Sequence, residues 1–221
     1  MVESYRAVYS AGDGEIIEKK SRFLASVQPV ESEEEALNYI EQVKKKHWGA
    51  THNCYAYVIG KMNQIQRYSD DGEPGGTAGK PMLEVLLSKS IHNTVVVVTR
   101  YFGGTLLGTG GLVRAYTNAA IEGLNNSIII DKVAGEKIII TTDYNGIGKI
   151  QYIACQMQIT VLDTVYTDIV SMELLVPLAL VSSFSKEITQ ATSGRASIEE
   201  HGKFYFAKLN EEIITFNEMV E

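Results

Sequence analysis

The feature that most constrains the fold is an apolar segment, residues 93–102, that contains four consecutive valines. A strand that is apolar at successive positions is covered on both faces of its sheet, so we expect a buried β-strand here. Two glycine-rich segments, 69–79 and 103–111, precede and follow it. Because glycine lets backbone N–H groups approach a ligand closely, we expect two loops that can form a site.

The rest of the N-terminal part shows mixed strand and helix patterns. Strands are expected at 6–9, 21–30 and 53–59, with a short closing strand at 128–130. An S-x-x-E capping box at Ser32 predicts a helix that ends near His47. Pro81, at a first helical position, opens a second helix, and the second glycine-rich loop leads into a third.

The C-terminal part follows a different order of elements. Its pattern predicts strand 137–142, helix 144–157, strands 159–166 and 169–176, helix 178–191 and strand 203–209. This βαββαβ order is the ferredoxin-like plan. The plan occurs with many functions and specifies none of them.

Charge divides unevenly between these two parts. The whole chain of 221 residues has a net charge of −7, which opposes binding of nucleic acid by its entire surface. Residues 1–134 carry 14 basic and 15 acidic side chains, whereas residues 135–221 carry 6 and 12. We therefore expect two domains, 1–134 and 135–221. Any nucleic-acid contact would be a local patch on the first, and the acidic second domain could dock a basic protein partner.

The sequence predicts a cytoplasmic protein with no membrane association. The longest apolar run, 174–181, has eight residues, whereas a membrane span needs about 20. The two cysteines, Cys54 and Cys155, lie about a hundred positions apart, so a disulfide framework is not expected. Nothing in the sequence specifies an oligomeric state.

The first glycine-rich loop carries three carboxylates, Asp70, Asp71 and Glu73, and ends beside Lys80. Its Gly75-x-x-x-Gly79-Lys80 spacing is one residue short of a phosphate loop and no Ser or Thr follows the lysine, which argues against a nucleotide triphosphatase. The carboxylates either cap their own turns or supply acid–base or metal-binding groups. They lack the spacing of a known metal loop, so no metal site is predicted.

Arg100 and Arg114 flank the second glycine-rich loop. Arg100 ends the apolar strand, where a charge needs an internal carboxylate or a bound anion as partner. One interpretation pairs Arg100 with Asp70 or Asp71, and the other has both arginines bind an anion. The glycines at 108–111 do not match the dinucleotide-binding fingerprint.

His52 and Cys54 alternate onto one face of an expected strand. They lack the further ligands of a zinc site, and residues two apart on a strand need not touch as a nucleophilic pair. We expect a half-buried histidine that can contribute to a polar cleft, and a cysteine that packs as a small hydrophobic residue.

Five ordered blocks resemble the YigZ/IMPACT family. They read KSRF at 20–23, HNCYAY at 52–57, the loop at 69–81, RYFGG at 100–104 and LGTGGLVRAY at 107–116. They cover most of residues 19–116, and the βαββαβ tail matches the extra C-terminal domain of bacterial members. Gly75 departs from the small serine expected in the loop and removes one hydroxyl.

The resemblance implies an α+β fold. The N-terminal domain would have the left-handed βαβ arrangement of a small-subunit ribosomal protein and of domain IV of elongation factor G. The C-terminal domain would be ferredoxin-like, similar to the last domain of that factor. Such domains work on the ribosome, which implies an RNA-binding or translation-linked role by analogy. Eukaryotic members are translational regulators acting on initiation-factor kinase signalling, and they carry a partner-binding domain that this chain lacks.

Two functions follow as hypotheses. The first is a cytoplasmic, non-catalytic translation-associated regulator that binds RNA, the ribosome or another anionic partner. Its expected contacts are Lys20, Arg22, His52, Lys80, Arg100 and Arg114, with the loop amides of Gly103, Gly104, Gly108, Gly110 and Gly111. The alternative is a hydrolase of a phosphorylated or peptide-like small molecule that uses Asp70, Asp71 or Glu73. No cofactor is predicted.

Overall fold

The computed structural model describes residues 2–210 and 212–216. Tyr5–Asp131 forms one compact unit, the N-terminal unit, and the other described residues form a second, the C-terminal unit. This division differs from the one drawn between residues 134 and 135. The strand β8 (Ile128–Thr142) runs without a break through both positions.

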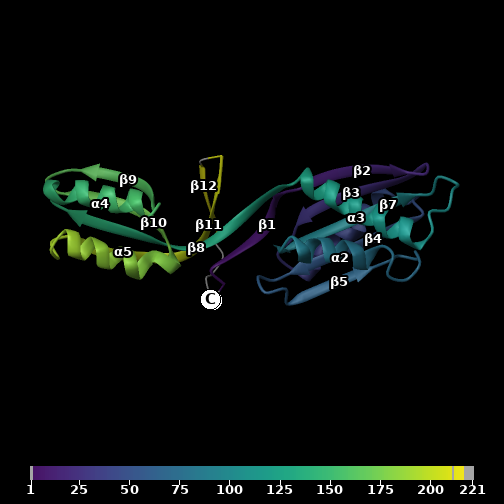
Figure 1. Ribbon diagram of the computed structural model, residues 1–221, viewed down its shortest axis with the longest axis horizontal. Coiled ribbons are helices and arrows are strands. Elements are labelled where there is room, and N and C mark those ends of the chain that lie inside the picture. The colour runs from purple at the N-terminus through teal and green to yellow at the C-terminus, as the bar shows by residue number, and fades with distance from the viewer. Residues whose placement is uncertain (1, 211, 217–221) are drawn as a thin grey trace. The chain divides into compact units, whose positions relative to one another are not determined.

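The N-terminal unit is built on a five-stranded sheet with the order β2-β3-β7-β4-β5, in which all neighbours are antiparallel (Figure 1). The strands are β2 (Gly12–Glu18), β3 (Ser21–Pro29), β7 (Thr94–Tyr101), β4 (His52–Ile59) and β5 (Ile65–Ser69). The central strand β7 is buried at every position except Tyr101, as its valines predicted. Two further strands, β1 (Ser4–Ser10) and β6 (Ile91–His92), pair in parallel outside this sheet.

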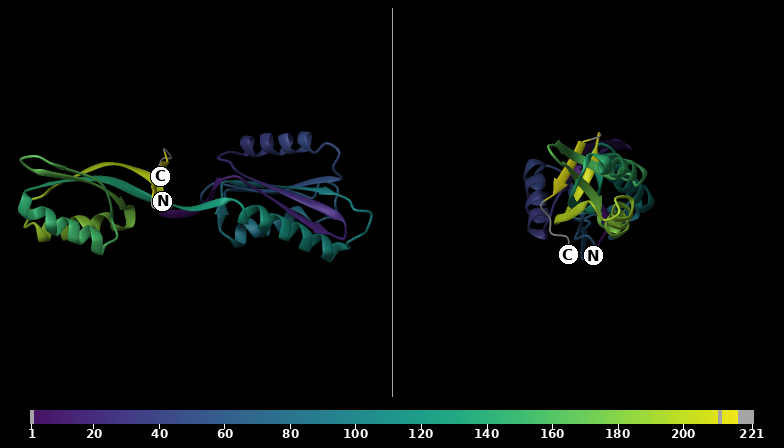
Figure 2. Two further views of the ribbon diagram at one scale, coloured as in Figure 1. Left: turned by 90° about the horizontal axis from the view of Figure 1, so that it is seen from above. Right: turned by 90° about the vertical axis from the view of Figure 1, so that its left-hand side faces the viewer.

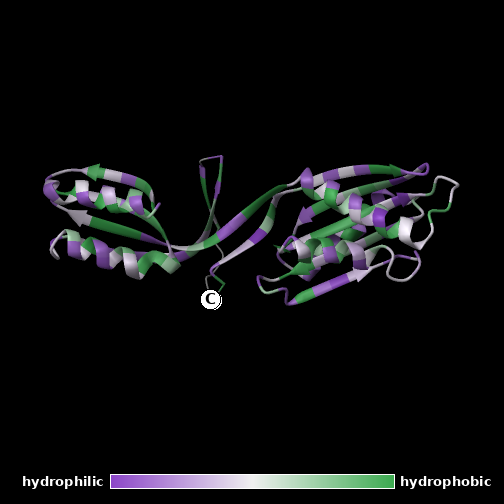
Figure 3. Cartoon of the chain, in the orientation of Figure 1, coloured by the Kyte–Doolittle hydropathy of each residue, from purple (hydrophilic) through white to green (hydrophobic). Residues whose placement is uncertain are grey.

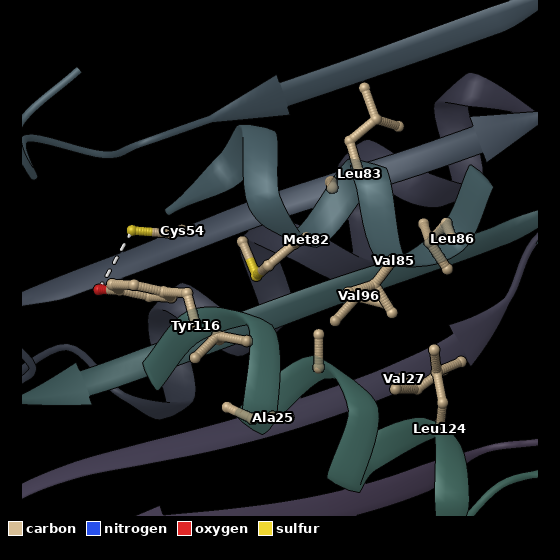
Figure 4. Close-up of a cluster of buried hydrophobic side chains, with 14 of the residues drawn as sticks. Ala25, Val27, Cys54, Met82, Leu83, Val85, Leu86, Val96, Tyr116 and Leu124 are labelled. Atoms are coloured by element: carbon tan, nitrogen blue, oxygen red, sulfur yellow. Dashed lines mark hydrogen bonds between the residues drawn. The ribbon is translucent and has the colours of Figure 1, made fainter. Parts of the chain in front are cut away.

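Helices cover both faces of the five-stranded sheet (Figure 2). The helix α1 (Glu33–Lys46) packs Ile40 and Val43 onto one face. The helices α2 (Gly79–Ser88) and α3 (Thr109–Asn125) pack onto the other, where Met82 and Tyr116 join a larger buried cluster (Figure 4). The sheet therefore separates two apolar cores, and its strand ends carry the loops.

Several expected elements need correction. The strands β2 and β5 were not predicted, because both are rich in polar residues; Figure 3 shows that β5 is largely hydrophilic. Helix α2 begins at Gly79, two residues before Pro81, and α3 begins at Thr109, inside the segment expected as loop. The capping box is confirmed, because Ser32 Oγ accepts a hydrogen bond from the backbone N–H of Glu35.

The C-terminal unit confirms the ferredoxin-like plan and the α+β class. After β8 come α4 (Tyr144–Gln156), β9 (Thr160–Tyr166), β10 (Val170–Pro177), α5 (Leu178–Ala191), β11 (Ser197–Leu209) and β12 (Glu212–Phe216). Antiparallel pairing gives the order β11-β8-β10-β9. Both helices pack on Ile138, Ile140 and Met172. The segments expected as separate strands at 128–130 and 137–142 are one strand, and β12 was not predicted.

None of the helices in the described part of the chain is long and apolar enough to cross a membrane.

Candidate functional site

One end of the N-terminal sheet gathers the segments that the sequence singled out. We call it the loop end and define it by residues 19–20, 47–51, 69–79 and 102–108. The pairing of His52 with Arg100 and of Arg22 with Tyr101 brings the start of β4, the start of β3 and the end of β7 together here. Residues that are up to about eighty positions apart in the sequence, such as Arg22 and Tyr101, therefore lie next to each other here.

Asp70 fixes the shape of the first glycine-rich loop. Its carboxylate accepts hydrogen bonds from the backbone N–H groups of Gly76, Ala78 and Gly79, at 2.8, 3.0 and 2.9 Å. These groups lie at the start of α2, where free N–H groups and the helix dipole favour a negative charge. Asp70 therefore caps the start of a helix up to nine residues away, whereas the sequence analysis expected a carboxylate that caps its own turn or supplies acid–base or metal-binding chemistry.

Asp71 and His52 join the loop to β4. The Asp71 carboxylate accepts a hydrogen bond from the backbone N–H of Asn53 at 2.6 Å, and His52 Nδ1 lies 2.8 Å from the Asp71 carbonyl oxygen. The thiol of Cys54 donates to the Asp70 carbonyl oxygen. Burial raises the pKa of Cys54 far above its ordinary value. The thiol therefore stays protonated, which is the inert packing role expected of it.

Arg100 pairs inside the protein, but not with the carboxylate that was expected. Its Nη1 atom lies 2.6 Å from Glu73 Oε1, whereas Asp70 and Asp71 bind backbone N–H groups. Tyr116 donates its hydroxyl to the same Glu73 oxygen at 2.8 Å. An aspartate side chain is short and bonds readily to nearby backbone, so the longer glutamate is the one that reaches the strand.

The Arg100 guanidinium is held on several sides. It lies 5.3 and 5.4 Å from the ring centroids of Phe23 and Phe102, and its Nη2 lies 3.4 Å from Ser21 Oγ. Its Nε is buried and has no hydrogen-bond partner in the described part of the chain. Only 5% of Arg100 is exposed, so this side chain belongs to the scaffold of the loop end.

Gly103 is required by close packing. Its N–H donates to Ser21 Oγ at 3.1 Å, and a Cβ at this position would lie 2.0 Å from the carbonyl carbon of Lys20. Gly104 and Gly108 have positive φ angles of 81° and 73°. Gly110 has open space where a Cβ would stand. The glycines of the second loop thus serve different purposes, and among them only Gly103 is required by a neighbouring backbone.

The other expected contacts differ in accessibility. Lys20, Lys80 and Arg114 are exposed. Arg22 is also exposed and forms an ion pair with Glu15 at 2.7 Å. His52 is half-buried, and its Nε2 lies 3.9 Å from Glu73 Oε2. The structure therefore splits the six expected contacts into four accessible cations and an interior group formed by His52 and Arg100.

A pocket of about 290 Å³ lies beside the first turns of α3. It is lined by Ile16, Glu18, Lys19, Leu107, Gly111, Arg114, Ala115 and Asn118. Gly108, the residue before α3, has no side chain to cap the first N–H groups of the helix. Sequence reasoning missed Lys19, because the strand β2 that precedes it was not predicted and the turn at 19–20 was therefore not recognised. It also missed Tyr116, which entered the sequence analysis only as the last residue of the block 107–116.

Within the described residues, no group of three or more His, Cys, Asp or Glu side chains is arranged to hold a metal ion. The three loop carboxylates all accept hydrogen bonds from the chain itself. Their geometry is that of side chains that hold a loop in shape.

The fold and this site define a two-domain α+β protein of a known type. Residues 19–124 match the model of the Impact N-terminal domain, and residues 140–195 match a domain of unknown function, DUF1949. A solved structure titled "Crystal structure of an hypothetical protein" has a TM-score of 0.59 and 32% sequence identity, covering 90% of this chain and 97% of that one.

Two bacterial relatives match most of the chain. IMPACT family member YvyE of Bacillus subtilis (strain 168) is 42% identical over 208 residues, which is 94% of this chain and 96% of the relative. IMPACT family member YigZ of Escherichia coli (strain K12) is 34% identical over 178 residues, covering 80% and 87%. The chain belongs to the IMPACT family, and the resemblance found in its sequence is confirmed.

Proposed function

We propose that this protein is a non-catalytic, translation-associated regulator that binds RNA phosphates at the loop end of its N-terminal unit. Family membership supports the link to translation, because the resemblance identifies eukaryotic members as translational regulators. The N-terminal unit is the part of the chain that is close to electrical neutrality, so a local cationic patch is not outweighed by its surroundings.

The observation that carries the proposal is the pocket at the start of α3. Lys19 and Arg114 line it together with Gly111, and one carboxylate, Glu18, lies among them. The uncapped N–H groups of a helix start and its dipole attract anions, and arginine can contact two phosphate oxygens at once. Its volume of about 290 Å³ leaves room for a phosphate group and its sugar.

The buried ion pair of Arg100 and Glu73 reduces the number of residues that we expect to contact RNA. Arg100 is neutralised by Glu73 and is almost fully buried, so it holds the loops rather than the ligand. The RNA contacts are then Lys19, Lys20, Lys80 and Arg114, with Arg22 shared between Glu15 and the ligand. All three loop carboxylates accept hydrogen bonds from the protein itself. This supports a binding function over the hydrolase alternative, in which they would act on a substrate.

A salt series tests the proposal. Labelled ribosomal RNA fragments are titrated with the protein, and binding is followed by fluorescence anisotropy at several salt concentrations. We expect binding that weakens as salt rises, because phosphate contacts release counterions. Lys20→Ala with Arg114→Ala should weaken binding and reduce the salt slope by roughly one for each contact removed.

The matched control is Lys89→Ala with Lys208→Ala, which also removes two exposed cations but lies outside the loop end. We expect this control to bind like the parent. The proposal is rejected by absence of binding at low salt, or by equal binding of the two double variants.

A further inference from the structure

We infer that the loop end takes single-stranded RNA, with an unpaired base stacked on the indole of Trp48. This inference rests on the proposed function and adds the class of nucleic acid that the same end of the protein accepts. Trp48 is the only tryptophan of the chain, and 88% of it is exposed. Tryptophan is on average a highly buried residue, so an indole left almost entirely in water marks a surface that a partner covers.

The backbone around Trp48 is tied to the end of the central strand. Thr51 N–H donates to the Arg100 carbonyl oxygen at 2.9 Å, and the N–H of Phe102 donates to Thr51 Oγ1 at 3.2 Å. His47 Nδ1 lies 3.0 Å from the hydroxyl of Tyr101. These bonds hold the segment 47–51 next to the loop 102–108, so the indole is presented from a fixed turn.

The neighbouring loop adds further exposed apolar surface. Phe102 is 46% exposed and Leu106 is 82% exposed. Neither the segment 47–51 nor the loop 102–108 contains a carboxylate. These two segments of the loop end therefore add no negative charge that would repel a phosphate backbone.

Positive charge lies directly before Trp48 in the chain. Lys44, Lys45 and Lys46 form the last turn of α1, and the last two are exposed. Cations at this position also complement the negative end of the helix. That role, however, does not require an exposed indole two residues later. A cationic stretch beside an exposed aromatic ring is the combination by which proteins bind single strands.

Three acidic residues near this stretch have partners within the protein, and the first is Glu41, whose Oε1 lies 3.7 Å from Lys44 Nζ. Asp13 and Glu15 line a pocket of about 360 Å³ with Lys46 and His47. Asp13 accepts a hydrogen bond from Ser26, and Glu15 is paired with Arg22. Their charges are partly compensated within the protein.

The chemistry favours an unpaired strand over a duplex. In an A-form helix the faces of the bases are covered by their neighbours, whereas single-stranded segments can splay a base onto an aromatic side chain. Stacking on an indole is tolerant of sequence, because every base has a flat π face.

The fluorescence of the Trp48 indole can report directly on stacking of a base. A twelve-nucleotide oligouridylate and an RNA duplex of equal length are titrated separately while indole fluorescence and the anisotropy of labelled RNA are recorded. We expect the single strand to quench the indole and to bind more tightly than the duplex. Trp48→Ala should weaken binding of the single strand about 5- to 150-fold, which corresponds to one stacked base.

Two further variants separate stacking from general damage. Met62→Ala removes a large apolar side chain that is 70% exposed in the turn between β4 and β5, at the opposite end of the sheet, and should leave affinity unchanged. Trp48→Phe keeps an aromatic face and should recover much of the lost affinity.

The outcomes distinguish this inference from the proposed function. Salt-dependent RNA binding without indole quenching, and with equal affinity of Trp48→Ala and the parent, overturns the stacking inference alone. Tighter binding of the duplex also overturns it. Absence of any RNA binding at low salt overturns both.

Discussion

Arg100 and Glu73 form a buried ion pair in which the guanidinium Nη1 lies 2.6 Å from the carboxylate Oε1. The two residues are 5% and 8% exposed. One comes from the central strand and the other from the first glycine-rich loop, so the pair ties that loop to the sheet. Tyr116 adds a hydroxyl from α3 to the same oxygen, which joins a third element to the pair.

Removal of one partner of this pair should be more damaging than removal of both charges. We expect Arg100→Met to lower the free energy of unfolding by about 3–5 kcal/mol, because Glu73 is left buried and uncompensated. Glu73→Gln combined with Arg100→Met should cost less than Arg100→Met alone, and therefore less than the two single changes added together. Urea denaturation of the parent, the two single variants and the double variant gives the coupling free energy between the two side chains.

The same double variant tests where Arg100 acts. If it is a scaffold residue, the folded double variant binds RNA with the affinity of the parent. A loss of affinity comparable to that of Lys20→Ala with Arg114→Ala would instead make Arg100 a direct contact.

Two glycines of the second loop should respond oppositely to alanine. Gly103→Ala should lower the free energy of unfolding by about 1–3 kcal/mol, because the new methyl group would overlap the backbone of Lys20. Gly110→Ala has free space within the first turn of α3 and should raise stability by up to about 1 kcal/mol. Thermal unfolding of both variants provides the measurement, and equal effects would contradict the packing argument.

The two cysteines should differ in reactivity. Cys54 is buried and its pKa is raised by burial, whereas Cys155 is exposed in the C-terminal unit. Only a thiolate reacts, so a thiol-specific chromogenic reagent should modify Cys155 in the native protein and both residues in denaturant. Cys155→Ser should then show no fast-reacting thiol. Rapid native labelling of that variant would show that Cys54 is accessible.

Glu136 makes stability depend on pH in the C-terminal unit. It is 4% exposed, and its pKa is raised above the ordinary 4.5 mainly by burial and further by the charge of Glu200, against the opposite effect of Lys203. A raised carboxyl pKa favours the folded state fully below about pH 4.5, and the gain is lost as pH rises through the folded-state value.

Glu136→Gln should therefore be more stable than the parent at neutral pH, and this advantage should shrink as pH falls toward about 4. Urea midpoints at both pH values test the sign. Glu187→Gln, at an exposed position of α5, is the matched control. An advantage of Glu136→Gln that grows on acidification would disprove the assignment.

Strong local patterns made most of the fold predictable. The valines of β7, the capping box at Ser32 and the βαββαβ order all correspond to elements that the structure contains. The two missed strands of the five-stranded sheet share a physical cause. Both β2 and β5 lie at edges of the sheet and expose most of their side chains, so their apolar alternation is weak.

Many of the residues of the site could be named from the sequence, but the carboxylate that pairs with Arg100 could not. The sequence identified Arg100 and three loop carboxylates as candidate partners. Which of Asp70, Asp71 and Glu73 pairs with Arg100 depends on the path of the loop. That path turns through positive φ at Asp71 and Gly72, which directs Glu73 inward. Trp48 was not considered, because a lone aromatic residue after a helix has no periodic pattern around it.

The three backbone bonds to Asp70 mean that the first loop is fully shaped before any partner arrives. Under the proposed function, RNA binding needs no ordering of this segment, so association should be a single kinetic phase. Its rate would be governed by diffusion and by the attraction between opposite charges. The heat-capacity change of binding would likewise reflect the contact area alone, without the contribution that accompanies folding of a disordered loop.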